Sequence, residues 1–144
     1  MSTVDLTAET FPSAINEGIV LVDFWASWCG PCRQFAPIFE KAAGQHTDIT
    51  FGKVDTEAEQ MLAGQAGITS IPTLMAFRDG ILLYAQPGAI PGAGLEELIS
   101  KIRQVDMDEV RASLAEEDAA RAAAGSIGPD DELGTGATTA RAGG

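Results

Sequence analysis

The two cysteines of this chain, Cys29 and Cys32, stand three positions apart in the run Trp28-Cys29-Gly30-Pro31-Cys32. A disulfide between such close neighbours closes a very short loop. In the chain-entropy model it contributes roughly 2 kcal/mol, against about 4.7 kcal/mol for a hundred-residue loop. A thiolate, on the other hand, can attack the disulfide of another molecule and form a new disulfide with it. The spacing therefore predicts redox chemistry at this pair rather than a structural crosslink.

The pair lies where a strand gives way to a helix. Residues 19–25 form an apolar run typical of a buried strand, and a helix is predicted over residues 32–46, with Pro31 suited to its first turn. A free cysteine is about 3% ionised at pH 7, and a helix N-terminus stabilises an anion by about 0.3–2 kcal/mol. We therefore expect Cys29 to be the exposed attacking thiolate. Cys32, one helical turn inward, is expected at disulfide-bonding distance, where it can resolve a mixed disulfide.

A metal site is the alternative interpretation of the two cysteines. A four-sulfur zinc centre needs two such pairs, whereas this chain has a single pair and a single histidine, His46. Only a site shared between two chains stays open. His46 falls near the predicted end of the helix, where a capping or surface role is expected rather than a catalytic one.

The remaining pattern predicts an α/β fold with a central mixed five-stranded sheet flanked by four helices. The first part of the sheet is expected to be parallel and the final hairpin antiparallel. Before the cysteines we expect a first strand at 2–5 and a helix over 7–15 capped by Thr7. After them we expect a strand at 49–54 and a helix from Asp55 to Ala66 that Gly67 ends. Strands at 73–78 and 81–85 are joined by the turn Asp79-Gly80, and a loop at 88–94 leads to a last helix with Leu95, Leu98, Ile99 and Ile102 on one face.

Charge and composition divide the chain near Val105. Residues 1–105 carry 12 acidic and 6 basic side chains, and residues 106–144 carry 9 and 3. We expect a catalytic domain over 1–105, a helical extension over 106–124 and a disordered Gly/Ala-rich tail over 125–144. The net charge of −12 argues against nucleic acid as a partner. No apolar run is long enough for a membrane span, and the N-terminal residues lack a secretory signal, which predicts a cytoplasmic protein.

Several segments resemble the thioredoxin family, and the resemblance runs from about Val4 to Val105. It is carried by Val22-Asp23-Phe24-Trp25-Ala26, the cysteine run, Ala36-Pro37, Lys53-Val54-Asp55, Ile71-Pro72-Thr73, Asp79-Gly80 and Gly88-Ala89. The resemblance implies the thioredoxin fold and a monomeric protein-disulfide reductase. It also implies disulfide-containing protein substrates and re-reduction by an NADPH-dependent flavoprotein reductase. No cofactor other than the redox-active disulfide is expected, since no glycine-rich dinucleotide fingerprint follows a strand.

Asp23 and Lys53 acquire roles through this resemblance. Asp23 is an acid in an apolar strand, so a raised pKa is expected, and in the family this carboxylate assists deprotonation of the second cysteine. Lys53 matches the lysine that pairs with it. The alternatives are an edge-facing or capping aspartate and a solvated lysine at the end of a strand.

The resemblance also implies a docking surface around Cys29. Pro72 matches a cis proline that packs against the disulfide and leaves the backbone of Ile71 free to pair with an extended substrate. The supporting and docking residues are then Trp25, Trp28, Gly30, Pro31, Ile71, Pro72, Gly88 and Ala89. Core packing is the alternative for both tryptophans.

The function stays open between three classes at this point. A reductant is favoured by the Gly30-Pro31 dipeptide, an oxidase or isomerase on the same fold is the second class, and a non-catalytic binding subunit is the third. Pro87 and the residues after Val105 depart from the family pattern. Neither departure touches the chemistry, so they bear on the choice of partner.

Overall fold

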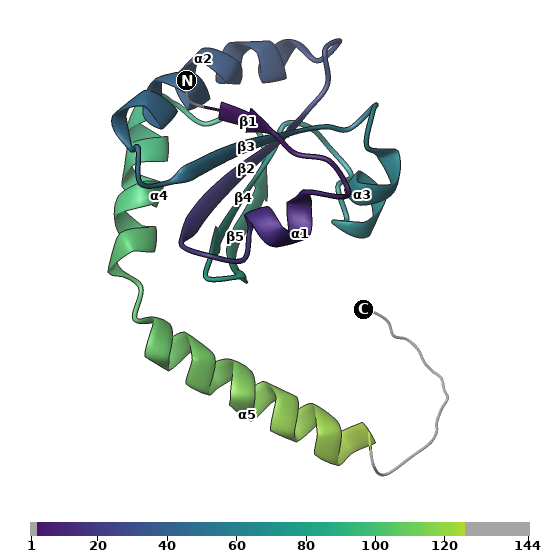
Figure 1. The fold of residues 1–144 in the computed structure, drawn as a ribbon, viewed down its shortest axis with the longest axis vertical. Coiled ribbons are helices and arrows are strands. Elements are labelled where there is room, and N and C mark those ends of the chain that lie inside the picture. Colours follow the sequence, from purple (N-terminus) through teal and green to yellow (C-terminus); the bar gives the residue numbers. More distant parts are fainter. Residues whose placement is uncertain (1–2, 126–144) are drawn as a thin grey trace. The chain divides into compact units, whose positions relative to one another are not determined.

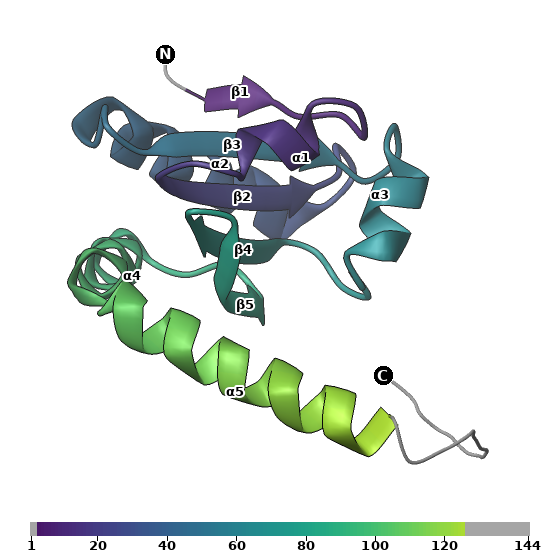
Figure 2. The same ribbon diagram turned by 60° about the horizontal axis from the view of Figure 1, so that its bottom comes forward.

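A mixed sheet has at its centre the strand that leads to the cysteines. The computed structural model describes residues 3–125. Over this range the sheet has the order β1 (Thr3–Asp5), β3 (Thr50–Asp55), β2 (Ile19–Trp25), β4 (Thr73–Arg78) and β5 (Ile81–Pro87) (Figure 2). β3 is parallel to β1 and β2, whereas β4 is antiparallel to β2 and β5. The predicted fold class is confirmed.

Helices cover both faces of this sheet because β2 is apolar on both sides. Leu21 joins the cluster under α2 (Gly30–Gln45) and α4 (Gly92–Gln104). Val22 and Phe24 join the cluster under α1 (Phe11–Ala14) and α3 (Gln60–Gln65). Figure 1 shows α1 and α3 close to the strands. Successive strand residues point to opposite faces, so a central strand with both faces covered reads as a continuous apolar run.

Two helices begin later than the sequence predicts, because side chains form local turns first. The predicted cap of α1, Thr7, exchanges hydrogen bonds with Thr10 instead, and the helix begins only at Phe11. The carboxylate of Asp55 accepts hydrogen bonds from the amides of residues 57 and 58, and α3 begins at Gln60. Such local side-chain bonds compete with helix formation.

Three other boundaries differ by a few residues, and two turns agree with prediction. α2 begins at Gly30, two residues early, α4 begins at Gly92 inside the predicted loop, and β5 continues to Pro87. Asp79 and Gly80 have φ values of 53° and 84°, as a two-residue hairpin turn requires. Gly67, with φ of 73°, directly follows the C-cap residue of α3.

The helix α5 (Met107–Gly125) belongs to the second of two compact units, which divide between Gln104 and Val105. The carboxylate of Asp106 accepts hydrogen bonds from the amides of Asp108 and Glu109 and so caps its first turn. The predicted disordered tail lies outside the described residues from residue 126 onward. No helix within residues 3–125 is long and apolar enough to cross a membrane.

Candidate active site

Cys29 is the N-cap residue of α2. Its backbone is extended (φ −90°, ψ 114°), and its Sγ atom accepts a 3.2 Å hydrogen bond from the amide of Cys32. Pro31 occupies the first turn, where a missing amide hydrogen breaks no helical bond. Serine, threonine and aspartate usually occupy the N-cap position, because an oxygen acceptor satisfies a free amide there. Here a sulfur atom takes that position, so negative charge on Cys29 faces the positive end of the helix.

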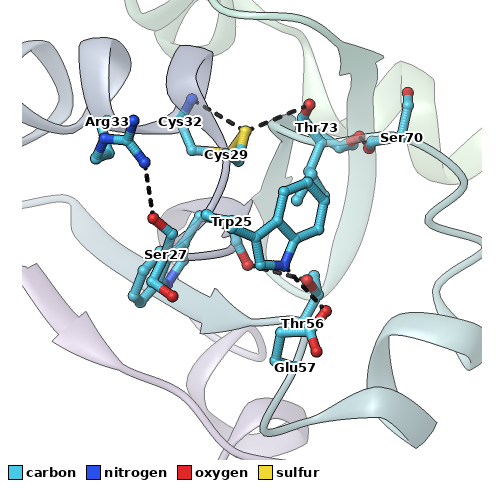
Figure 3. Close-up of a disulfide and its surroundings, with 11 residues drawn as sticks. Trp25, Ser27, Cys29, Cys32, Arg33, Thr56, Glu57, Ser70 and Thr73 are labelled. Atoms are coloured by element: carbon cyan, nitrogen blue, oxygen red, sulfur yellow. Dashed lines mark hydrogen bonds between the residues drawn. A yellow bond between two sulfur atoms is a disulfide. The ribbon is translucent and has the colours of Figure 1, made fainter.

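Cys29 and Cys32 form a disulfide across the first turn of α2, as predicted, with their Cα atoms 5.2 Å apart (Figure 3). The expectation that Cys29 is exposed is wrong for this oxidised state. Cys29 is 5% exposed and Cys32 is 2% exposed. The two cysteines pack with Ala26, Trp25 and Ile71, and a loop 42 positions away in the chain therefore shields the first sulfur.

The loop at Ile71 and Pro72 lies against this sulfur, and the segment at Gly88 is bonded to that loop. The Ile71–Pro72 bond is cis, as predicted, and the carbonyl oxygen of Ile71 lies 3.8 Å from Cys29 Sγ. The amide of Gly88 donates a 2.7 Å hydrogen bond to the carbonyl of Pro72, and Gly88 and Ala89 are exposed. The Thr73 hydroxyl holds the same loop by donating a 2.5 Å hydrogen bond to the Ser70 carbonyl. The family resemblance implies that these segments share one surface, and the structure shows Ile71 beside Cys29 and Gly88 bonded to Pro72.

Asp23 is completely buried, and both of its carboxylate oxygens lack a hydrogen-bond partner within the described residues. It lies two positions from Leu21 and therefore on the face of β2 that α2 covers. Burial raises the pKa of Asp23 from 3.8 to about 7, and the positive charge of Lys53 opposes this rise. The expected raised pKa is confirmed, and an edge-facing or capping aspartate is excluded.

Lys53 stands opposite Asp23 in the parallel register of β2 and β3, so both side chains leave the same face of the sheet. Its Nζ atom lies 4.9 Å from the centre of the Trp25 ring, which is within the range of a cation–π contact. Lys53 therefore acts on Asp23 through its charge while its ammonium group lies over the indole.

Two residues that the sequence reasoning missed also contact the cysteine loop. Glu57 Oε2 accepts a 3.3 Å hydrogen bond from the indole of Trp28, which is itself 64% exposed. Arg33 donates a 2.9 Å hydrogen bond to the carbonyl of Ser27 and thereby ties the loop to α2 (Figure 3). No spacing or residue type in the sequence marked either side chain, because each contact depends on how the turns fold.

His46 is the C-cap residue of α2 and contacts side chains on α4 rather than the cysteines. Its Nε2 atom lies 2.7 Å from Glu96 Oε1, and its Nδ1 atom lies 3.2 Å from Arg103. Arg103 also binds both oxygens of Asp48 at 2.7 and 3.0 Å, and this hydrogen bonding lowers the pKa of Asp48 to about 2. The network links the end of α2 to α4 at the opposite end of α2 from the disulfide.

Metal ligands do not converge anywhere in the part of the chain that the structure describes. No group of three His, Cys, Asp or Glu side chains there could hold an ion.

A bonded cysteine pair at the start of a helix, with a cis-proline loop over it, defines a thiol–disulfide oxidoreductase. The family model described as Thioredoxin matches residues 2–104. A Streptomyces coelicolor protein named "Putative thioredoxin 2" is 54% identical over 119 residues, which cover 82% of this chain and 89% of that protein. The Bacillus subtilis protein named "Thioredoxin" is 39% identical over 102 residues, or 70% of this chain and 98% of that protein.

A solved structure of Malassezia sympodialis thioredoxin matches with a TM-score of 0.62 and 30% identity. The match covers 69% of this chain and 90% of that one. The chain belongs to the thioredoxin family.

Proposed function

We propose that this chain is a reductant that transfers two electrons from its cysteine pair to disulfides of other proteins. The observation that carries the proposal is the sulfur of Cys29 at the N-cap of α2, where the Cys32 amide donates to it. This contact stabilises a thiolate more than a thiol, and the thiolate is the form that attacks a substrate disulfide.

Cys29 is proposed as the attacking residue. Its thiolate bonds to one sulfur of the substrate disulfide, the substrate S–S bond breaks, and the departing sulfur takes up a proton. The Ile71 carbonyl lies 3.8 Å from Cys29 Sγ, so the attacked disulfide is proposed to approach the sulfur beside this loop.

Cys32 is proposed to resolve the mixed disulfide with the help of Asp23. Asp23 takes the Cys32 proton, the resulting thiolate attacks Cys29 Sγ, and the second substrate sulfur leaves. A carboxyl group with a pKa of about 7 can both accept and return a proton near neutral pH. Lys53 keeps this pKa from rising further.

The other predicted site residues are proposed as support and docking surface. Trp28, Gly30, Pro31 and Pro72 would shape the turn, and Trp25, Ile71, Gly88 and Ala89 would contact the substrate. The packing of Trp25 and Ile71 against the cysteines and the hydrogen bond from Gly88 to Pro72 support this assignment. An extended substrate could add its backbone to that of Ile71.

An NADPH-dependent flavoprotein reductase is proposed to restore the dithiol, so that the chain itself needs no bound cofactor. We further propose that it acts as a monomer in the cytoplasm, where thiols are kept reduced. Residues 1–105 are proposed as the catalytic domain, because every residue given a role above lies between positions 23 and 89. The extension after Val105 would then bear on the choice of partner.

Reduction of insulin disulfides tests the proposal. The wild type should turn over with dithiothreitol as electron source, and Cys32→Ser should abolish turnover while trapping a mixed disulfide through Cys29. Cys29→Ser is the matched control and should trap nothing. If Cys32→Ser traps no adduct, the assigned roles are wrong.

The reduction potential separates the reductant from an oxidase or isomerase. The reduction potential should lie near the thioredoxin value of about −270 mV. A strongly oxidising protein has a potential of about −120 mV instead. A non-catalytic binding subunit would instead keep its function in the double variant Cys29→Ser/Cys32→Ser.

A further inference from the structure

A groove of about 490 Å³ opens beside the disulfide, between the cysteine loop and α3. Trp28 lines it on the cysteine side, Gln60 and Gly64 line it from α3, and Ile68 and Ile71 line it from the loop that precedes β4. Trp28 directly precedes Cys29 in the chain, and the Ile71 carbonyl lies 3.8 Å from Cys29 Sγ. Residues that flank a sulfur bound to Cys29 can therefore enter this groove.

Among the described residues that line the groove, Glu57 is the sole ionisable one. Its carboxylate accepts the indole hydrogen of Trp28, and Trp28 is 64% exposed. The groove thus pairs a negative charge with an accessible aromatic ring. A lysine or arginine is attracted by both groups, since a carboxylate binds its charge and an indole face binds cations.

Acidic side chains find no opposite charge in this arrangement. Within residues 3–125 no lysine, arginine or histidine lines the groove, so an acidic flanking residue there meets the like charge of Glu57 and is repelled. The chain as a whole carries a net charge of −12, which adds to the repulsion at low ionic strength.

We propose that the groove makes the protein select disulfides that have a lysine or arginine within about three residues of the attacked cysteine. Glu57 is the residue that sets this preference, with Trp28 as its aromatic partner. The inference rests on the proposed reductase function and adds the class of substrate to it.

The test uses oxidised homodimers of a short synthetic peptide with one cysteine. Three peptides are compared. Each has the same residue, either lysine, glutamine or glutamate, two positions before and two positions after the cysteine. The measured quantity is the second-order rate constant with which each peptide oxidises the reduced protein. We expect lysine to exceed glutamate by about fivefold at low salt, corresponding to about 1 kcal/mol. The ratio should fall toward one in 1 M salt, where the Debye length is about 3 Å.

Glu57→Gln keeps an acceptor for the Trp28 indole and removes the charge, so the lysine-to-glutamate ratio should fall to near one. Glu40→Gln is the matched control, because it changes the net charge equally from an exposed position on α2 outside the groove. It should keep the wild-type ratio. Equal wild-type rates for the lysine and glutamate peptides overturn the inference, as does an equal loss of preference in both variants. A protein that reduces none of the three peptides would instead contradict the proposed function itself.

Discussion

Lys53 lies directly across from Asp23 on the neighbouring parallel strand, with its Nζ atom 4.9 Å from the Trp25 ring centre. The lysine lowers the pKa of Asp23, but burial outweighs it and the pKa rises to about 7. Both carboxylate oxygens lack a hydrogen-bond partner within residues 3–125. The ionised form of Asp23 is therefore poorly solvated, and the stability of the fold must depend on pH.

Asp23→Asn should make the oxidised protein more stable than the wild type above pH 7 and leave it close to the wild type near pH 4. The carboxyl ionises near pH 3.8 when unfolded and near pH 7 when folded. The wild type therefore loses stability as the pH rises from about 4 to 7, because only the unfolded state has released its proton. This separation corresponds to about 4 kcal/mol. Guanidinium unfolding at pH 4 and pH 8 measures it, and a parallel pH dependence in both proteins would contradict the assignment to Asp23.

Cys29 of the reduced protein should react with iodoacetamide at neutral pH at least about tenfold faster than Cys32. The sulfur of Cys29 lies at the N-cap and accepts a hydrogen bond from the amide of Cys32, whereas Cys32 lies inside the first turn of the helix. Fragment mass spectrometry of the partly alkylated protein locates the label. The same reaction in concentrated guanidinium chloride is the control, where the difference should vanish. Equal labelling of both sulfurs in the folded protein would show that the helix does not activate Cys29.

Gly52→Ala should destabilise the fold by about 1–3 kcal/mol, the usual cost of overpacking a core. A Cβ atom at Gly52 would collide with the side chain of Leu6, which is buried in the core. Gly44→Ala is the matched control, because a Cβ there meets no heavy atom within 4 Å and Gly44 lies in α2. It should raise stability by up to about 1 kcal/mol. Unfolding midpoints compare the two variants, and an unchanged midpoint for Gly52→Ala would mean that Leu6 has room to move.

Neutral His46 should carry its proton on Nε2. Arg103 lies 3.2 Å from Nδ1, and a guanidinium group can only donate, so Nδ1 must accept while Nε2 donates to Glu96. Long-range proton–nitrogen NMR distinguishes the two tautomers. Arg103→Met should allow the Nδ1-protonated form to appear, whereas Lys101→Met, which removes another positive charge from α4, should not. Wild-type protein with its proton on Nδ1 would contradict the network.

The sequence predicted the central part of the fold because its signals there are strong and independent. The apolar run of residues 19–25 and the turn at Asp79-Gly80 each allow few alternatives. The starts of α1 and α3 could not be predicted so well. The side chains of Thr7 and Asp55 can cap either a helix or a local turn, and the two choices differ little in energy.

The site shows the same division between local and distant information. The disulfide was predictable because both cysteines lie in one motif, and the cis bond before Pro72 followed from the family resemblance. The burial of Cys29 could not be predicted, because the loop that covers it comes from a distant part of the chain. Glu57 was missed for a related reason, since only the folded turn brings it to the indole of Trp28.

The place of β2 between β3 and β4 also protects the strand that leads to the cysteines when the sheet opens partly. Both edges of this strand are hydrogen-bonded to neighbours, so its amides reach deuterated solvent only when the sheet separates on one side. The edge strand β1 has three residues and one neighbour, and it can fray without disturbing the centre. Fraying of the edge strand therefore leaves β2, and the two cysteines that follow it in the chain, in place.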